Sequence, residues 1–256
     1  MLRNFINSQM QLSSKFDTYL PDKYTIDGNT DYRNSLVPKY LKQDLTVYDV
    51  GGGKRPYINL EQKKALNATV IGLDIDQDEL NKAPQGAYDR VICADIAKYK
   101  GSQDADLLIC QAVLEHVQNV EGAFASISSI LKPGGLALIF VPSKNAVFAQ
   151  INLILPQELK KTLLHTIYPR MIEGQGFPSY YNQCTPRDFK QLAQSNNLSV
   201  IEECYYYVSA YFAFFFPAYF VWRLWILLFH KIYQEQAAET FSLVLQKNDW
   251  EWLTVS

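Results

Sequence analysis

Three aspartates stand at positions where carboxylates could bind a cationic ligand. Asp49 lies in "VYDVGGGKRP", Asp74 in "VIGLDID" and Asp95 in "CADI", so each of them ends a short apolar run. Gly51 and Gly53 follow the first aspartate, and glycine lets the backbone adopt a positive φ and approach a ligand closely. Carboxylates beside such a loop attract positive charge by Coulomb forces. The pattern therefore indicates a binding site for a positively charged ligand.

Two nucleoside ligands fit acidic strand ends of this kind. Asp74 could accept hydrogen bonds from both hydroxyls of a ribose, which is also how NAD enzymes use an acid at this place. Pro56 stands where the dinucleotide fingerprint has its third glycine or an alanine. Asp49 suits the ammonium and sulfonium groups of S-adenosylmethionine better than a pyrophosphate. S-adenosylmethionine is thus the favoured cofactor, and a nicotinamide-dependent oxidoreductase is the alternative.

Seven apolar runs are predicted to form the strands that position these aspartates. They lie at 45–50, 67–75, 89–96, 105–113, 136–143, 198–208 and 240–247. The early runs are continuously apolar, which is typical of parallel strands that are covered on both faces. Helical stretches alternate with them, for example around 58–66 and at 121–132. The sequence therefore predicts an α/β fold with a seven-stranded doubly wound (Rossmann-like) sheet.

Two helix ends carry clear signals. The sequence "PGG" after 121–132 is expected to stop that helix. Farther along the chain, Thr185 is predicted to cap a helix, with Pro186 at the first helical position and Asp188 at the spacing of a capping box.

The motifs "YDVGGG", "GLDID", "CADI", "LLICQAVLEHV" and "LKPGGLALIFVPS" occur in this order within residues 45–143. Together they resemble the ordered motifs of class I S-adenosylmethionine-dependent methyltransferases, in particular the type 11 group. The resemblance implies a mostly parallel sheet with an antiparallel last strand. We expect a single domain over 1–256, with an N-terminal arm (1–44), a substrate-side insertion (144–185) and an aromatic, apolar insertion (208–239). The missing third glycine and the long gap between Gly53 and Asp74 depart from the family pattern.

The resemblance also implies how the chain would hold the cofactor. The residues that it places beside the methionine part are Asp49, Gly51 and Gly53. Asp74 is expected at the ribose with Ile75 beside the adenine, and Asp95 and Ile96 are expected to meet the adenine. Gln111 is expected along the cofactor, near the methyl group that is transferred.

The residues on the acceptor side are less specific. His116 in "LEHV" is a candidate general base for an oxygen acceptor, and a structural role is the alternative. His165 is a weaker candidate. No cluster of acids suits a metal ion, so we expect metal-independent chemistry. Phe177, Tyr180 and Tyr181 are predicted to line the acceptor pocket.

The stretch "YFAFFFPAYFVWRLWILLFH" (211–230) is almost wholly apolar. A single membrane crossing there would separate the last strand from its sheet, because that strand must return to the same side. We expect instead a bent or hairpin-like pair of helices around Pro217, lying in one leaflet, with Trp222 among the inserted side chains and Arg223 reaching toward the headgroups. The alternatives for 208–233 are a lid over the active site, a homodimer interface and ordinary core.

Composition narrows the class of protein further. The 256 residues carry a formal net charge of −2 and no long basic run, so we expect no nucleic-acid partner. Four scattered cysteines and a polar N-terminus favour a reduced, cytoplasmic protein, with peripheral contact to the cytoplasmic membrane as an option.

The predicted function is O-methylation of a small or lipid-linked acceptor, such as a glycan, a quinone-like ring or a polyketide-like product. A non-catalytic cofactor-binding or interaction module is the second alternative.

Overall fold

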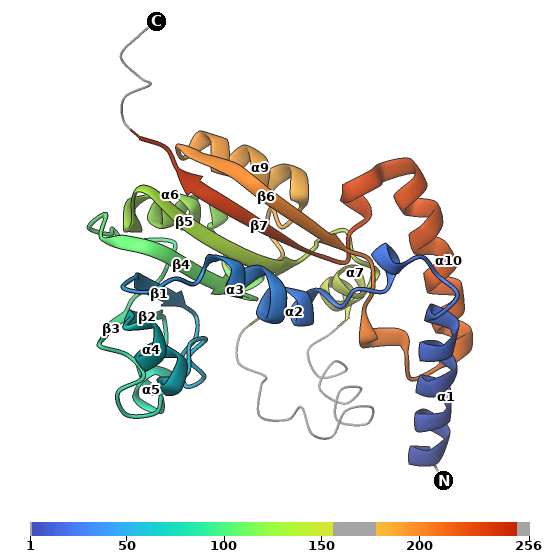
Figure 1. Cartoon of the computed structure of the whole chain (residues 1–256). Helices are drawn as coiled ribbons and strands as arrows, with labels where there is room; N and C mark the ends of the chain where they lie inside the picture. Colours follow the sequence, from blue (N-terminus) through green and yellow to red (C-terminus); the bar gives the residue numbers. More distant parts are fainter. Residues whose placement is uncertain (1, 156–177, 250–256) are drawn as a thin grey trace, which may run out of the picture.

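One mixed sheet organises the chain, of which the computed structural model describes residues 2–155 and 178–249 (Figure 1). The strand order is β3-β2-β1-β4-β5-β7-β6. β7 pairs antiparallel with both β5 and β6, and the other pairs are parallel. The predicted seven-stranded sheet with an antiparallel last strand is therefore confirmed. The strands are β1 (Thr46–Val50), β2 (Thr69–Asp74), β3 (Arg90–Cys93), β4 (Ala105–Gln111), β5 (Leu131–Pro142), β6 (Leu198–Tyr206) and β7 (Thr240–Lys247).

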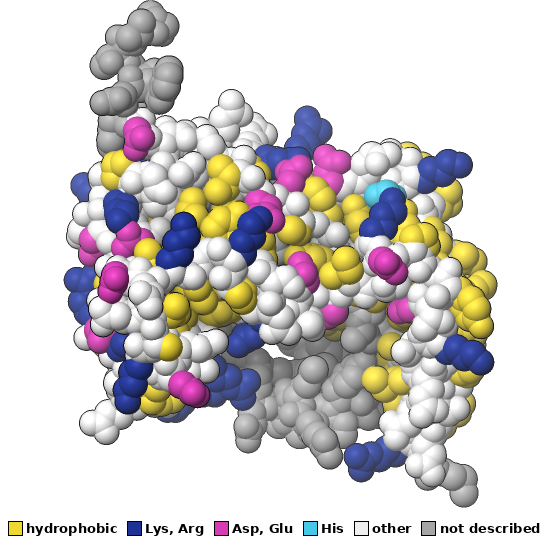
Figure 2. All heavy atoms as spheres, viewed as in Figure 1, with side chains coloured by type: hydrophobic (Ala, Val, Ile, Leu, Met, Phe, Trp, Pro, Cys, Tyr) yellow, Lys and Arg dark blue, Asp and Glu magenta, His cyan; other side chains and the backbone are white. Residues whose placement is uncertain are grey.

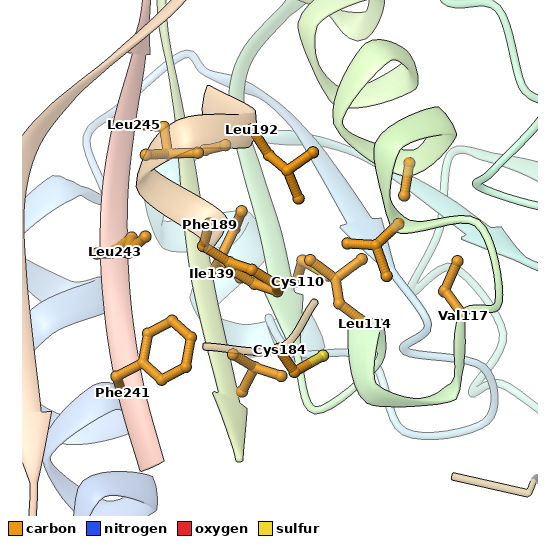
Figure 3. Packing of buried hydrophobic residues seen from close by; sticks show 14 of the residues in the cluster. Cys110, Leu114, Val117, Ile139, Cys184, Phe189, Leu192, Phe241, Leu243 and Leu245 are labelled. Atoms are coloured by element: carbon orange, nitrogen blue, oxygen red, sulfur yellow. The ribbon is translucent and has the colours of Figure 1, made fainter. Parts of the chain in front are cut away.

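Helices cover one face of this sheet along β4, β5 and β7. α6 (Val120–Ile130) and α9 (Pro186–Ser195) supply buried side chains to the larger core cluster. Phe189 of α9 lies 5.0 Å from Phe124 of α6 and 5.3 Å from Phe241 of β7, measured between ring centroids. Figure 3 shows Phe189 of α9 next to Ile139 of β5. This face is thus a continuous apolar layer between helices and strands.

The N-terminal arm covers part of the opposite face (Figure 1). Its short helices are α2 (Gly28–Asp31), a π-helical turn η2 (Tyr32–Leu36) and α3 (Val37–Tyr40). Tyr32 is fully buried and its hydroxyl donates to the backbone oxygen of Leu138 at 2.7 Å. Tyr206 donates to the Asp31 carboxylate at 2.8 Å. These bonds tie the arm to β5 and β6.

The remaining described elements are short, apart from two. They are η1 (Asp22–Tyr24), α4 (Leu60–Leu66), α5 (Gln77–Asn81), η3 (Leu114–His116), α7 (Val147–Ile154), η5 (Ala210–Phe212) and η6 (Gln234–Ala237). The two long helices are α1 (Leu2–Asp17) and α10 (Phe216–Tyr233), and they pack against each other at the edge of the molecule (Figure 1).

The capping prediction at α9 is confirmed, and the end of α6 is corrected. Thr185 accepts a hydrogen bond from the Asp188 N–H, and Pro186 begins the helix. α6 ends at Ile130, because the residue before Pro133 is disfavoured in the α-helical conformation. β5 accordingly begins at Leu131, ahead of the "PGG" sequence that was expected to lie between helix and strand.

The apolar stretch forms one helix, so the predicted bent or hairpin-like pair is wrong. Pro217 lies in the first turn of α10, where a helix needs no N–H from it. Trp222 was expected to insert into a leaflet, but it is buried against the protein. Within the part of the chain that the structure describes, no helix has the length and apolar character needed to span a membrane.

Arg223 points inward, so its predicted approach to lipid headgroups is wrong. The side chain is 1% exposed. Its Nε donates to the Asp17 carboxylate at 2.9 Å, and its other nitrogens donate to the backbone oxygens of Tyr207 and Tyr24 at 2.7 and 2.6 Å. The planar guanidinium can satisfy three acceptors at once. It therefore ties α10 to α1, to η1 and to the end of β6.

Arg223→Gln should lower the free energy of unfolding by about 3 kcal/mol, because it leaves Asp17 and two buried carbonyls without a donor. Urea unfolding measures this change. Lys231→Gln, on the exposed side of the same helix, is the control and should change stability by less than about 0.5 kcal/mol. Equal stability of the two variants would contradict the central role of Arg223.

Candidate functional site

The glycine loop connects β1 with α4 at the carboxyl end of the sheet. Gly51 has φ +76°, and a Cβ there would lie 2.3 Å from the Val113 side chain, just after β4. Gly53 has φ +47°, and a Cβ there would lie 3.1 Å from the Asp74 carboxylate. Side chains are excluded at both positions by strain and by these neighbours. The loop backbone is therefore held between the ends of β2 and β4.

Asp49 lies beneath this loop and is almost completely buried, with 3% of its surface exposed. Its carboxylate accepts hydrogen bonds from the Tyr57 N–H at 2.7 Å and from the Tyr88 hydroxyl at 3.1 Å. Burial raises the pKa of the Asp49 carboxyl to about 6, although these two donors act in the opposite direction. Gly52 leaves room for the carboxylate, because a Cβ there would lie 2.3 Å from it. Asp49 thus shapes the loop as well as carrying charge.

Asp74 ends β2 on the open side of the loop. Its side chain is half-buried and accepts a hydrogen bond from the Asp76 N–H at 3.0 Å. Burial, followed by the nearby charges of Asp76 and Glu79, raises the pKa of the Asp74 carboxyl. Ile75 beside it is 57% exposed, so an apolar side chain faces outward next to the acid. A carboxylate with an apolar neighbour suits a ligand with hydroxyls and a flat ring.

The third predicted pair, Asp95 and Ile96, divides between surface and interior. The Asp95 carboxylate is partly exposed, accepts from the Ala97 N–H at 2.9 Å and lies 3.7 Å from the Lys98 ammonium. Ile96 is 5% exposed and belongs to the core cluster. The Asp95 carboxylate is therefore accessible to a ligand at the carboxyl ends of the strands, whereas the Ile96 side chain packs in the core.

Arg33 of the N-terminal arm is a site residue that the sequence reasoning missed. Its guanidinium donates to the Gln111 side chain at 3.1 Å and lies 4.9 Å from the centre of the Tyr57 ring. It also favours the ionised form of Asp49. Gln111 in turn donates to the side chain of Asn29. The arm thus brings a positive charge to the end of β4, close to the acids, and nothing within the sequence motifs signals this.

His116 and Glu115 lie in η3, just after β4. His116 Nδ1 is 3.1 Å from the backbone oxygen of Pro178 and 3.3 Å from the Ser179 hydroxyl, and Nε2 is 3.8 Å from the Glu115 carboxylate. A carbonyl oxygen only accepts, so Nδ1 donates to it. Burial raises the pKa of the Glu115 carboxyl to about 8. A histidine thus lies beside a buried carboxyl group.

Aromatic residues border this histidine on the acceptor side. The backbone N–H groups of Tyr180 and Tyr181 donate to the Glu115 backbone oxygen at 2.8 and 3.0 Å. Tyr181 is buried, and its hydroxyl accepts from the Asn152 amide at 3.3 Å. Phe148 of α7 stacks on Tyr211, with the ring centroids 4.4 Å apart. Both predicted tyrosines therefore lie close to η3 in space, although they are distant from it in the sequence.

Two predicted residues, Phe177 and His165, lie outside the described residues. Within residues 2–155 and 178–249, no group of three or more His, Cys, Asp or Glu side chains could hold a metal ion.

The chain matches a known family over most of its length. The family described as "Methyltransferase domain" covers residues 22–203. A malonyl-acyl-carrier-protein O-methyltransferase of Ilyobacter polytropus is 28% identical over 139 residues, which is 53% of this chain and 50% of that protein. A ubiquinone biosynthesis O-methyltransferase of Coxiella burnetii is 26% identical over 184 residues, which is 66% of this chain and 72% of that one. The chain thus spans about half the length of the first of these relatives.

Solved structures share the fold at low sequence identity. Phosphoethanolamine N-methyltransferase 2 of Haemonchus contortus, in complex with S-adenosyl-L-methionine, has a TM-score of 0.55 and 12% identity, covering 97% of this chain and 60% of that one. The cyclase SpnF has a TM-score of 0.53 and 16% identity, covering 88% of this chain and 86% of that one. These likenesses show the fold, which by itself does not decide a reaction.

Glu115→Gln should change how stability depends on pH. Between the ordinary carboxyl pKa of 4.5 and about 8, the unfolded chain loses this proton while the folded chain keeps it. The folded state then binds more protons, so wild-type stability falls as the pH rises through this window. Relative to wild type, the variant should therefore gain a few kcal/mol of stability from about pH 5 to pH 8.

Urea unfolding at both pH values measures this gain. Glu121→Gln, which changes an exposed acid in the first turn of α6, is the control and should show no such trend. A constant difference between Glu115→Gln and wild type across the window would contradict the buried neutral acid.

Proposed function

Because the chain belongs to the methyltransferase-domain family of class I S-adenosylmethionine-dependent enzymes, we propose that it transfers a methyl group from S-adenosylmethionine to an oxygen of a small, partly apolar acceptor. One observation carries the proposal, namely the glycine loop held against Asp74 at the carboxyl end of the sheet. Ligands of doubly wound sheets bind at this end of the strands. The family match also favours methyl transfer over the nicotinamide-dependent alternative.

The residues at this end fit the charges of S-adenosylmethionine. Asp74 would accept the ribose hydroxyls, with Ile75 against the adenine and Asp95 near its amino group. Asp49 supplies negative charge beneath the loop for the ammonium and sulfonium. Arg33 would pair with the carboxylate of the methionine part, which the predicted acids alone could not neutralise. When bound, the cofactor supplies an electrophilic methyl group on a sulfonium.

The protein's own contribution to the reaction is placement and proton removal. Aligning two reactants supplies a large part of the acceleration in such displacements. His116 lies on the acceptor side, so it would take the hydroxyl proton of an oxygen acceptor. The Pro178 carbonyl accepts from Nδ1 of this histidine at 3.1 Å. An oxygen acceptor would make use of this base, because its hydroxyl must lose a proton on methylation.

Aromatic surfaces next to His116 suggest that the acceptor is apolar in part. Tyr181 and the stacked pair Phe148 and Tyr211 come from three separate segments around η3. The ubiquinone biosynthesis and malonyl-acyl-carrier-protein relatives are both O-methyltransferases by description. A ring or carboxyl group attached to an apolar chain would suit such a lining.

Asp74→Ala should weaken S-adenosylmethionine binding at least tenfold, because charge-assisted hydrogen bonds are worth about 1.5–3 kcal/mol. Isothermal titration calorimetry measures the affinity. Asp78→Ala removes an exposed acid four residues away and should leave the affinity within about twofold, since exposed charges are largely screened. Unchanged affinity in Asp74→Ala would refute the ribose assignment.

Methyl transfer itself is tested with labelled S-adenosylmethionine and fractionated polar and lipid extracts. Label should appear in one product that mass spectrometry identifies as an O-methyl compound. His116→Ala should reduce turnover at least about a hundredfold, as loss of a general base does, with cofactor affinity retained. Transfer to no fraction would overturn the proposed function, and undiminished turnover in His116→Ala would remove it as the base.

A further inference from the structure

The outer side of α10 presents a narrow apolar face. The residues on it are Val221, Leu224, Trp225, Leu228 and Ile232, each 48–66% exposed. At 3.6 residues per turn these positions fall within an arc of roughly 100°, which is the width of one helix face. The buried residues of the helix, among them Trp222 and Ile226, lie on the opposite side. We call these five residues the α10 stripe.

The charged residues of α10 and α1 are basic, apart from Asp17. α10 holds no acidic residue, and Lys231 is its exposed cation because Arg223 is buried. α1, which packs against α10, carries Arg3 and Lys15. Figure 2 shows basic side chains along this part of the molecule, next to apolar and acidic ones. The whole chain has a formal net charge of −2, so this local positive charge runs against the average.

Asp17, the acidic residue of α1, already has hydrogen-bond partners within the protein. Asp17 accepts from Arg223 at 2.9 Å, and the Tyr219 hydroxyl bonds its other oxygen. If two copies of the chain met through this surface, α10 would offer no acid to pair with Lys231. Like charges across an interface disfavour association. The surface is therefore better matched to an anionic partner than to a second copy.

Aromatic residues on and beside the stripe suit a lipid boundary. Trp225 lies within the stripe, and Tyr233 ends the helix with 54% exposure. Trp and Tyr prefer the boundary between headgroups and acyl chains. A helix with an apolar face, flanking cations and a length of about 27 Å can lie flat in that boundary.

The inner side of α10 adjoins the acceptor side of the site. Trp222 donates to the buried Glu239 carboxylate at 3.4 Å, at the start of β7. Tyr211, which stacks on Phe148 of α7, lies in η5, just ahead of α10 in the chain. A surface bound to α10 would therefore lie next to the proposed acceptor side.

We propose that the α10 stripe docks the protein on an anionic lipid bilayer, with α10 lying in the plane of the interface and the cations of α1 and α10 contacting the headgroups. This surface is separate from the cofactor-binding loop. Its test therefore does not depend on whether the chain transfers a methyl group, and calorimetry with S-adenosylmethionine checks that activity independently.

The test is flotation of the full chain with vesicles, without cofactor. Wild type should float with vesicles of phosphatidylcholine mixed with phosphatidylglycerol, and less with phosphatidylcholine alone. The triple variant Leu224→Gln, Trp225→Gln, Leu228→Gln should bind the mixed vesicles at least about tenfold more weakly, because it removes apolar surface that inserts. Lys15→Gln with Lys231→Gln should reduce the preference for the mixed vesicles.

The control is Val91→Gln with Ile201→Gln, which changes two other exposed apolar residues, 46% exposed each, on edge strands. It should float like wild type. The inference is overturned if wild type floats with neither vesicle, or if the triple variant floats as well as wild type. It is overturned equally if wild type is a dimer that the triple variant splits, because the stripe would then bind a second copy.

Discussion

The position of β7 determines where the functional parts of this molecule lie. β7 runs antiparallel between β5 and β6, so the connection that leaves β6 must return to the same end of the sheet. Two backbone hydrogen bonds fix that return, from Ser143 to Glu239 at 2.9 Å and from Glu239 to Tyr206 at 2.8 Å. The apolar helix α10 is therefore held at the carboxyl end, beside the segment that follows β4. The fold topology therefore places an apolar surface and the candidate acceptor site next to each other.

Low polarity at the carboxyl end of the sheet also explains why the pKa values of three buried carboxyl groups are raised. Burial raises the pKa of Asp49 to about 6, of Glu239 to about 7 and of Glu115 to about 8. A carboxylate in such surroundings lacks the hydration that would stabilise its charge. A positive group that binds near Asp49 would favour its ionised form, so cation binding and proton release are linked there.

Much of this arrangement was predictable, because it follows from local patterns. The apolar runs gave the strands, and the glycines after Asp49 marked a turn that needs positive φ. Strand ends moved by a few residues, as at Leu131, where Pro133 rather than the glycines decides the boundary. The acids at the ends of β1 and β2 come together because neighbouring parallel strands end at the same edge.

What the sequence did not reveal depends on contacts between distant segments. Arg33 reaches the site only because Tyr32 anchors the arm on β5, 106 residues away. Tyr88 and Tyr57 hold Asp49, but neither belongs to a motif. The hydropathy of residues 211–230 alone does not indicate that Asp17 lies beside Arg223. The sequence therefore did not predict that this arginine is buried. Asp17 on α1 and Tyr24 at the end of η1, which both bind the guanidinium, lie about 200 residues away in sequence.

The inward turn of Arg223 connects stability with the outer surface. An arginine in the middle of an exposed helix would ordinarily interrupt an apolar face and oppose its insertion into lipid. Here the guanidinium is satisfied inside by a carboxylate and two carbonyls, which offset the cost of removing it from water. The opposite side of α10 is left free of strong charge as a result. The contacts of Arg223 therefore hold α10 on the protein and also keep its charge away from the α10 stripe. Breaking these contacts would disturb both the packing of the helix and the apolar stripe.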